Sequence, residues 1–321
     1  MCTAISYVGK DSYFGRNLDL ERGYGECVAV MPRNYSFPMR TLPDVESHYA
    51  MIGMAYVADG VPLYYEATNE TGLSMAGLNF PDNAHYNEYC DGKDNVTPFE
   101  LIPYILGKCR DIDEAKELLG RINLVNISFS EELPLSPLHW IISDRYGGIT
   151  VESVKEGLKV YDNPYGVLTN NPTFDYHLMN INNYMGLHEG FAENRISENK
   201  RMLNYSLGMG ALGLPGDYSS ASRFVRAVFV KEKSPCFESE KESVSHFFHM
   251  LSAVAMPKGC VMTKSGEYEY TRYSCCCNAD TGVYYYTTYD NSSITAVDMH
   301  KCKLEGREIY RFTLAESFST N

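Results

Sequence analysis

Short segments rich in β-branched and aromatic residues, separated by turn formers, dominate the first eighty residues, and this pattern predicts antiparallel strands. The predicted strands there are residues 3–8, 13–19, 26–32, 50–57, 63–69 and 73–79. Predicted helices follow at 98–108 and 111–122, then strands at 138–144, 149–153 and 158–161. Further helices are expected at 173–186, 221–231 and 240–254, and sheet from 267 to about 298. With no linker or repeat between them, these elements predict one layered α+β domain of residues 1–321.

The composition supports a large folded core and argues against several classes of partner. The 321 residues are 44% hydrophobic and carry 28 Lys and Arg against 41 Asp and Glu, a net charge of −13. Without a basic run to follow a phosphate backbone, nucleic acid is not expected as a partner. No apolar window reaches the ~18 residues of a membrane span, and the N-terminus has no export signal. We therefore expect no membrane association and a cytoplasmic location.

Three sequence patterns that could indicate cofactors or metals have simpler explanations. The run Cys275–Cys277 lacks the spacing of a zinc site, so these residues are expected to be reduced, buried and small hydrophobes, with a redox or metal-binding role as the alternative. The G-x-G-x-x-G letters at 208–213 precede Pro215 and predict a loop. His246 and His249 have no acid at ligand spacing. No metal and no cofactor are expected.

The start of the chain, Met1-Cys2-Thr3, can provide a nucleophile and a base on one residue. Removal of Met1 would leave Cys2 with a thiol and a free α-amine. The thiolate is the attacking species, and an amine with a pKa of about 8 can take the thiol proton near neutral pH. Cys2 is therefore a candidate catalytic nucleophile of the N-terminal type.

The first predicted hairpin brings a carboxylate toward this residue. If the loop Gly9-Lys10-Asp11-Ser12 is unpaired, opposing positions sum to 21 and Asp19 lies directly across from Cys2. Arg16 lies in the same predicted strand, and a buried charge needs a partner. Residues three apart point to opposite faces of a regular strand, so we expect a bulge or twist at 16–19 that lets both approach Cys2.

Further polar residues interrupt apolar segments elsewhere in the chain. Asn79 ends an apolar run, Asn170 and Asn171 precede Pro172, and Arg223 lies near the start of a predicted helix. Each has a structural explanation on its own, because amide side chains at strand ends are commonly turn formers. Their combination is more specific.

In chain order, these residues form a series of motifs that covers essentially the whole sequence. The series is Cys2-Thr3, F-G-R-N-x-D, A-G-L-N-F, G-V-L-T-N-x-P-T-F, L-P-G-D-x-S-x-x-S-R-F and the tyrosine-rich GVYYYTTYDN. It closely resembles the choloylglycine hydrolase family of N-terminal-nucleophile hydrolases, which comprises bacterial bile salt hydrolases and penicillin V acylases. The resemblance implies a four-layer αββα sandwich of two mainly antiparallel sheets.

The resemblance also implies a role for each matching residue. Cys2 would be the nucleophile, Arg16 would help to keep its sulfur as a thiolate, and Asp19 would hold the α-amine. Asn79 and Asn170 would place the scissile amide and stabilise the oxyanion, and Arg223 would balance charge around the site. Asn170 is preferred to Asn171 because it follows Leu-Thr and is separated from the proline by one residue.

The implied substrates are conjugated bile salts, whose amide would be cleaved through a thioester with loss of glycine or taurine. An apolar pocket is then expected, and candidate lining residues are Leu18, Leu20, Tyr24, Tyr56, Ala58 and residues 128–137. Penicillin V acylase is the alternative activity, and Asn79 favours the bile salt reaction because penicillin V acylases commonly carry Tyr there. A non-catalytic bile-salt-binding relative is a further alternative, against which the intact residue set argues. The resemblance suggests a homotetramer.

Overall fold

The computed structural model describes residues 1–315 and 317, and within them the first of two large sheets has seven strands. In spatial order these are β12 (Val167–Leu168), β1 (Cys2–Val8), β2 (Ser12–Leu20), β14 (Tyr268–Asn278), β15 (Val283–Thr288) and β16 (Thr295–Asp298), with β13 (Val261–Met262) paired to β14. All of these pairs are antiparallel. β1 and β2 therefore lie inside the sheet, flanked by β12 and β14.

The second sheet has eight strands in the described part of the chain, and its pairs are also antiparallel. Its order is β11 (Gly157–Asp162), β10 (Gly147–Val154), β9 (Leu138–Asp144), β6 (Ser74–Asn79), β5 (Val61–Asn69), β4 (Met51–Ala58), β3 (Cys27–Met31) and β17 (Tyr310–Thr313). A separate parallel pair joins β7 (Asp94–Val96) to β8 (Ile122–Leu124). The mainly antiparallel prediction is confirmed.

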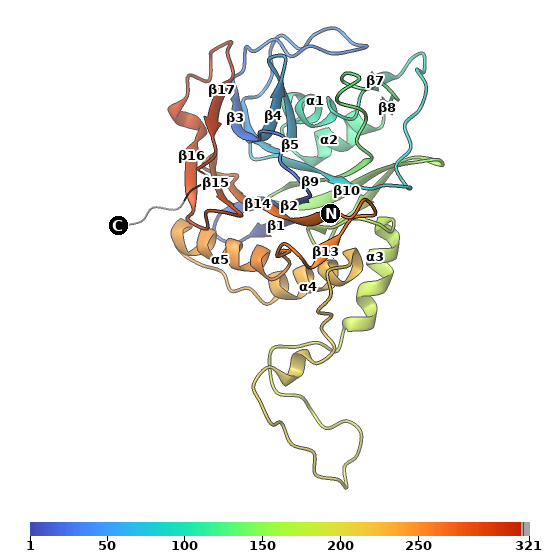
Figure 1. The fold of residues 1–321 in the computed structure, drawn as a ribbon, viewed down its shortest axis with the longest axis vertical. Helices are drawn as coiled ribbons and strands as arrows, with labels where there is room; N and C mark the ends of the chain where they lie inside the picture. The colour runs from blue at the N-terminus through green and yellow to red at the C-terminus, as the bar shows by residue number, and fades with distance from the viewer. Residues whose placement is uncertain (316, 318–321) are drawn as a thin grey trace.

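Helices cover both outer faces, so the order of layers is α, β, β, α (Figure 1). α1 (Leu101–Lys108) and α2 (Ile112–Leu119) pack on the second sheet, and α4 (Ser220–Glu232) and α5 (Glu240–Ser252) pack on the first. The remaining helical elements are α3 (Phe174–Asn180), η1 (Ile181–Tyr184), η2 (Met209–Ala211) and η3 (Met299–Lys301). The predicted α+β, four-layer architecture is confirmed, while the assignment of 1–321 to one domain stays a prediction.

Alternating apolar residues fill the spaces between the layers. Leu18 and Tyr273 of the first sheet belong to the same buried cluster as Met54, Leu78 and Ile141 of the second. A second cluster joins the outer face of the second sheet to α1 and α2. Each buried large aliphatic side chain contributes about 1.5–3 kcal/mol, so the inner faces hold the two sheets together.

The first hairpin differs from its predicted register by one residue. Its loop has three unpaired residues, Gly9 to Asp11, because Val8 already pairs with Ser12. Opposing positions therefore sum to 20, and Leu18 rather than Asp19 lies across from Cys2. The four turn-forming residues suggested a longer loop, but Ser12 is compatible with a strand and joins it.

The irregularity predicted at residues 16–19 lies in the neighbouring strand instead. The β1–β2 ladder is regular from Cys2 to Val8, and the register shift lies in β14, between Thr271 and Tyr273. Arg16 and Asp19 therefore do point to opposite faces of the first sheet, as a regular strand requires.

A long segment between α3 and α4 extends away from the layered body (Figure 1). It contains η2 and ends shortly before Ser220, so the G-x-G-x-x-G letters at 208–213 lie in a loop with one short 3-10 turn, as predicted. Among residues 1–315 and 317, no helix combines the length and the apolar character needed to cross a membrane.

Candidate active site

Cys2, the first residue of β1, is buried at the junction of β1, β12 and α4, with 2% of its surface exposed. Its backbone N–H donates to Asn170 Oδ1 at 2.9 Å, and its carbonyl accepts a hydrogen bond from Arg223 Nη1. Arg223 Nη1 also donates to Thr3 Oγ1 at 2.6 Å. Two of the predicted site residues thus contact the candidate nucleophile directly.

Met1 precedes β1 and is hydrogen-bonded to Asp19 of β2. Its carbonyl accepts from the Asp19 N–H and its ammonium donates to the Asp19 carbonyl, both at 3.0 Å. The ammonium also forms an ion pair with Glu269, and burial lowers its pKa. While Met1 is attached, the Cys2 nitrogen is a peptide amide and cannot take the thiol proton.

The amide of Asn170 is held by three partners at once. Oδ1 accepts from the Cys2 N–H and from Arg223 Nη2, the latter at 2.7 Å, and Nδ2 donates to the Asn79 carbonyl at 2.7 Å. Since Nδ2 carries two hydrogens, one remains for a substrate oxygen. Asn171 instead donates to Pro81 O and Asn83 Oδ1, at 2.6 and 2.7 Å. The structure therefore brings Asn170, not Asn171, to Cys2.

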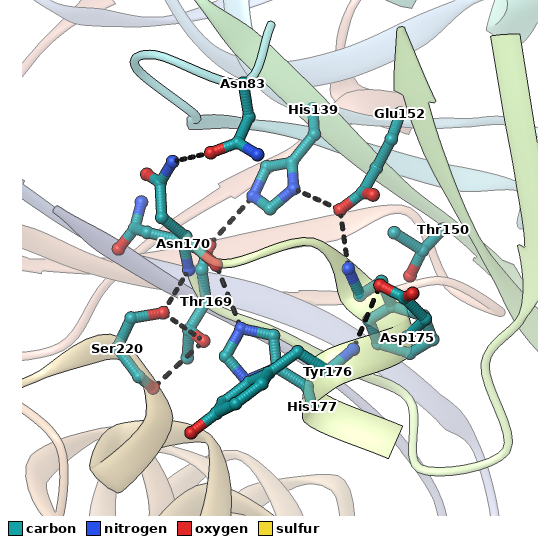
Figure 2. Close-up of polar contacts among 12 residues, drawn as sticks. Asn83, His139, Thr150, Glu152, Thr169, Asn170, Asp175, Tyr176, His177 and Ser220 are labelled. Atoms are coloured by element: carbon teal, nitrogen blue, oxygen red, sulfur yellow. Dashed lines mark hydrogen bonds and ion pairs between the residues drawn. The ribbon is translucent and has the colours of Figure 1, made fainter. Parts of the chain in front are cut away.

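Asn170 lies in a tight turn at residues 169–174, which we call the Asn170 turn (Figure 2). The Asn170 N–H donates to Ser220 Oγ at 2.8 Å, and Thr169 Oγ1 lies 2.9 Å from the same hydroxyl. His177 Nε2 lies 3.0 Å from the Asn170 carbonyl, and burial lowers the pKa of His177 to about 4. His177 is thus a neutral donor at physiological pH. The turn is fixed by hydrogen bonds to both its backbone and its side chains.

Arg16 shares the inner face of the first sheet with the Cys2 side chain. It pairs with Ala4 across the ladder, and Cys2 lies two residues before Ala4. Its Nη1 donates to the carbonyls of Tyr65 and Gly77, at 3.1 and 2.6 Å. Nη2 is buried without a hydrogen-bond partner among the described residues, so it is available to a thiolate.

A buried carboxylate of the second sheet accompanies Arg16. Glu66 Oε2 lies 3.8 Å from Arg16 Nε and accepts from the Tyr273 hydroxyl at 2.7 Å, while Oε1 accepts from Tyr284 at 2.6 Å. Burial raises the pKa of Glu66, and the positive charge of Arg16 opposes that rise. Burial alone would lower the pKa of Arg16, but attraction to Cys2, Tyr273 and Glu66 raises it. Arg16 therefore stays charged.

Asp19 lies on the opposite face, toward the helices. Its Oδ1 accepts from Thr271 Oγ1 at 2.6 Å, and Oδ2 is buried without a partner in the described part of the chain. Burial raises the pKa of Asp19, opposed chiefly by Arg223. Burial likewise lowers the pKa of Arg223, opposed by Asp19 and Cys2. Arg16 thus lies on the face of β2 that the Cys2 thiol shares, and Asp19 lies on the opposite face, with a regular β1–β2 ladder between them.

The other predicted residues are more widely spread. Asn79 is half-buried at the end of β6, and its side chain makes no hydrogen bond within residues 1–315 and 317. Leu18 lies directly opposite Cys2, and Leu20 packs on the same core. The remaining pocket candidates are Tyr24, exposed in the loop after β2, Tyr56 and Ala58 near the end of β4, and residues 128–137, an exposed to half-buried loop before β9.

Sequence reasoning missed three buried residues that bear on this site. Glu66, His139 and Glu152 are each the charged or imidazole residue of a mostly apolar strand, and each is at most 2% exposed. The signal that indicated Arg16 and Asp19, a charge inside an apolar segment, is present in LYYEATN, LHWIISD and ITVESV as well. Cys275–Cys277, in contrast, are buried free thiols as predicted, and burial raises the pKa of all three.

The chain is similar to known proteins over nearly its whole length. The chain is 52% identical over 314 residues to a bile salt hydrolase/transferase of Lactiplantibacillus plantarum (strain ATCC BAA-793 / NCIMB 8826 / WCFS1), covering 98% of this chain and 97% of that protein. The crystal structure of the C2A mutant of conjugated bile acid hydrolase from Clostridium perfringens superposes with a TM-score of 0.92 at 36% identity, covering 100% and 99% of the two chains. Penicillin V acylase from Agrobacterium tumefaciens shares the fold, with a TM-score of 0.78 at 21% identity over 99% and 94%.

The family model described as linear amide C–N hydrolases, choloylglycine hydrolase family, matches residues 2–312. The match begins at Cys2, the residue on which the hydrogen bonds of Asn170 and Arg223 converge. That match and the similarity to relatives over the whole chain make this protein a member of the choloylglycine hydrolase family of linear amide C–N hydrolases.

Proposed function

We propose that the mature chain hydrolyses the amide bond of glycine- or taurine-conjugated bile salts. The observation that carries this proposal is the arrangement at Cys2, whose thiol shares a face with Arg16 and whose nitrogen is bound by Asn170. The 52% identity to a bile salt hydrolase/transferase over nearly the whole chain supports the choice of substrate.

The proposed reaction begins once Met1 has been removed. The α-amine of Cys2 takes the thiol proton, and the thiolate attacks the amide carbon while Arg16 stabilises its charge. Asn170 Nδ2 and Asn79 donate to the oxyanion, a contribution typically of about 3–4 kcal/mol per donor. The amine then protonates the leaving nitrogen, which releases glycine or taurine and leaves a thioester. Water hydrolyses the thioester to the bile acid and free thiol.

The test combines intact mass with product release. The mature protein should have lost Met1 and should release glycine from glycocholate or taurine from taurocholate. Cys2→Ala should lower kcat by at least about 10⁴-fold, because the nucleophile is gone. Cys90→Ala, which removes an exposed thiol, is the matched control and should retain activity. Unchanged turnover in Cys2→Ala, or loss of activity in Cys275–Cys277→Ser variants alone, would contradict the proposal.

Penicillin V belongs in the same substrate panel. A kcat/KM for penicillin V above that for both bile salts would assign the alternative activity to the site. Binding of bile salts by the mature protein without product release would identify a non-catalytic relative. In the proposed function, glycocholate or taurocholate gives the highest kcat/KM.

We further propose a homotetramer working in the cytoplasm. The segment between α3 and α4 exposes apolar side chains, namely Met185, Phe191, Ile196, Leu203, Tyr205 and Leu207, and this number of exposed apolar residues in one segment favours an interface. The ten cysteines are free, which suits a reducing compartment. The double variant Ile196→Glu, Leu207→Glu should lower the mass measured by sedimentation. Tyr146→Glu is the control and should not lower it, because Tyr146 is 89% exposed and lies outside this segment. A monomeric wild-type chain would refute the assembly.

A further inference from the structure

Two buried residues of the second sheet reach the Asn170 turn (Figure 2). His139 in β9 and Glu152 in β10 are both 0% exposed, and His139 Nδ1 lies 3.1 Å from Glu152 Oε1. His139 Nε2 lies 3.1 Å from the Thr169 carbonyl, and Glu152 Oε1 accepts from the Phe174 N–H at 3.0 Å. The pair therefore contacts the turn at both of its ends, one residue before Asn170 and four residues after it.

The chemistry of these partners fixes where the protons lie. A carbonyl only accepts, so His139 Nε2 must carry a hydrogen to bond Thr169. A hydrogen bond between His139 Nδ1 and Glu152 Oε1 also needs a hydrogen on one of these two atoms. Neutral imidazole alone could not donate to both neighbours. The Phe80 ring also stacks on the His139 ring, with the ring centroids 4.2 Å apart and an angle of 7° between the planes. Glu152 on one side and Phe80 on the ring face thus fix the orientation in which His139 Nε2 meets the Thr169 carbonyl.

The other side of the turn is held from the helical layer. Ser220 of α4 accepts from the Asn170 N–H, and His177, packed on Phe224 at 4.9 Å, donates to the Asn170 carbonyl. The backbone at Asn170 is therefore fixed between α4 and the second sheet. Between these two layers, Asn170 Oδ1 accepts a hydrogen bond from the Cys2 N–H of the first sheet.

We propose that His139 and Glu152 are positioning residues that hold the Asn170 amide in its catalytic place beside Cys2. Neither touches Cys2, and both act through the backbone of the Asn170 turn. A buried charged pair is generally no more stabilising than apolar residues of the same size, so stability alone does not account for it. The inference rests on the proposed hydrolysis for its kinetic consequences, but its geometric consequence does not depend on the substrate.

Glu152→Gln is the direct test. Glutamine keeps the size, but neither end of its amide can replace Oε1 toward both neighbours. If the amide oxygen takes the place of Oε1, it accepts from Phe174, but a neutral His139 cannot donate both to it and to Thr169. If the amide nitrogen takes that place, it donates to His139 Nδ1 but cannot accept from Phe174. Either way, one hydrogen bond that supports the Asn170 turn is lost. In the mature protein, kcat for glycocholate should fall on the order of ten- to a hundredfold, as a small misplacement of a catalytic group does, with KM changed less than about twofold.

Two comparisons separate positioning from a merely structural role. Ser153→Ala removes a buried hydrogen bond to the His85 carbonyl from the same strand, so it should lower the melting temperature without lowering kcat. In an Asn170→Ala background, Glu152→Gln should cause no further loss of kcat, because the group that it positions is gone. His139→Gln should reproduce the same pattern and serves if Glu152→Gln does not fold.

A crystal structure of Glu152→Gln completes the test, with displacement of Asn170 Oδ1 from the Cys2 nitrogen as the expected result. Wild-type kcat in Glu152→Gln, an equal loss of kcat in the Asn170→Ala background, or an unmoved Asn170 would each overturn the inference. If the wild-type protein releases neither glycine nor taurine, the proposed function fails instead, and the position of Asn170 in the variant still decides the inference.

Discussion

The neighbouring amides Asn170 and Asn171 offer a matched pair for separating catalysis from folding. Asn170 binds Cys2 and Arg223, whereas Asn171 binds Pro81 and Asn83. Asn170→Ala should lower kcat for bile salt hydrolysis by about 10²–10³-fold with little change in KM, because the lost donor acts mainly in the transition state. Steady-state kinetics of the mature variants measures this.

Asn171→Ala is the control for the loss of an asparagine from the same turn. It should keep kcat within about threefold of wild type, since its hydrogen bonds are structural. An equal fall in kcat for both variants would mean that the conformation of the turn, rather than the Asn170 amide, had been measured.

The same residues show what the sequence could and could not predict at this scale. The charge in F-G-R-N-x-D and the amides at strand ends indicated Arg16, Asp19, Asn79 and Asn170 only in combination, through the family that the whole series of motifs resembles. The structure places all four around the start of β1. Glu66 was not selected, although it is the nearest carboxylate to Arg16. The two come from different sheets, and no local pattern specifies which strand faces which across the core.

Among the elements, β2 has a glycine, Gly15, at a point where the backbone of β14 leaves no room for a side chain. A Cβ on Gly15 would lie 1.9 Å from the Cys275 carbonyl oxygen, so any side chain would push the two strands apart. Gly15→Ala should lower the free energy of unfolding by at least about 3 kcal/mol, since the obstructing atom is backbone. Urea unfolding followed by circular dichroism gives this value.

Gly147→Ala provides the comparison for this prediction. Gly147 also lies in a strand, but a Cβ there meets nothing within 4 Å. Its midpoint of unfolding should stay close to that of the wild type. A Gly15→Ala protein as stable as Gly147→Ala would show that β2 and β14 can separate at little energetic cost.

Strand positions were easier to predict than strand register. β-branched and aromatic residues located β3, β4, β5, β6, β9, β10 and β11 from sequence, but short β7, β8, β12, β13 and β17 were missed because two to four residues carry little periodicity. The predicted register of the first hairpin was wrong by one residue, because Ser12 suits a turn and a strand equally. A slip of one residue exchanges faces, and it would have put Asp19 beside the thiol instead of Leu18.

For the molecule as a whole, buried His177 predicts a loss of stability in acid. The folded chain binds the His177 proton only near pH 4, whereas the unfolded chain binds it near pH 6.5. Protonation therefore favours the unfolded state as the pH falls between these values. The loss amounts to about 3 kcal/mol once the pH is below 4. Urea unfolding at several pH values between 7 and 4 measures it.

Replacement by glutamine isolates this contribution from that of the carboxylates. His177→Gln should flatten the profile between pH 6.5 and 4, because the amide does not titrate. His249→Gln, on the exposed side of α5, should leave the profile as in the wild type. A His177→Gln profile as steep as that of the wild type would rule out His177 as the source.

The pairing of Met1 with Asp19 makes the removal of Met1 depend on the order of events during synthesis and folding. The Met1–Cys2 bond lies at the end of the β1–β2 ladder, where the Asp19 N–H donates to the Met1 carbonyl and the Cys2 N–H donates to Asn170 Oδ1. A peptidase needs an opened chain, so removal of Met1 competes with closure of the hairpin. Under the proposed mechanism, chains that close first stay inactive, with the same fold and nearly the same mass as active ones. The specific activity of a preparation therefore records how often cleavage preceded folding.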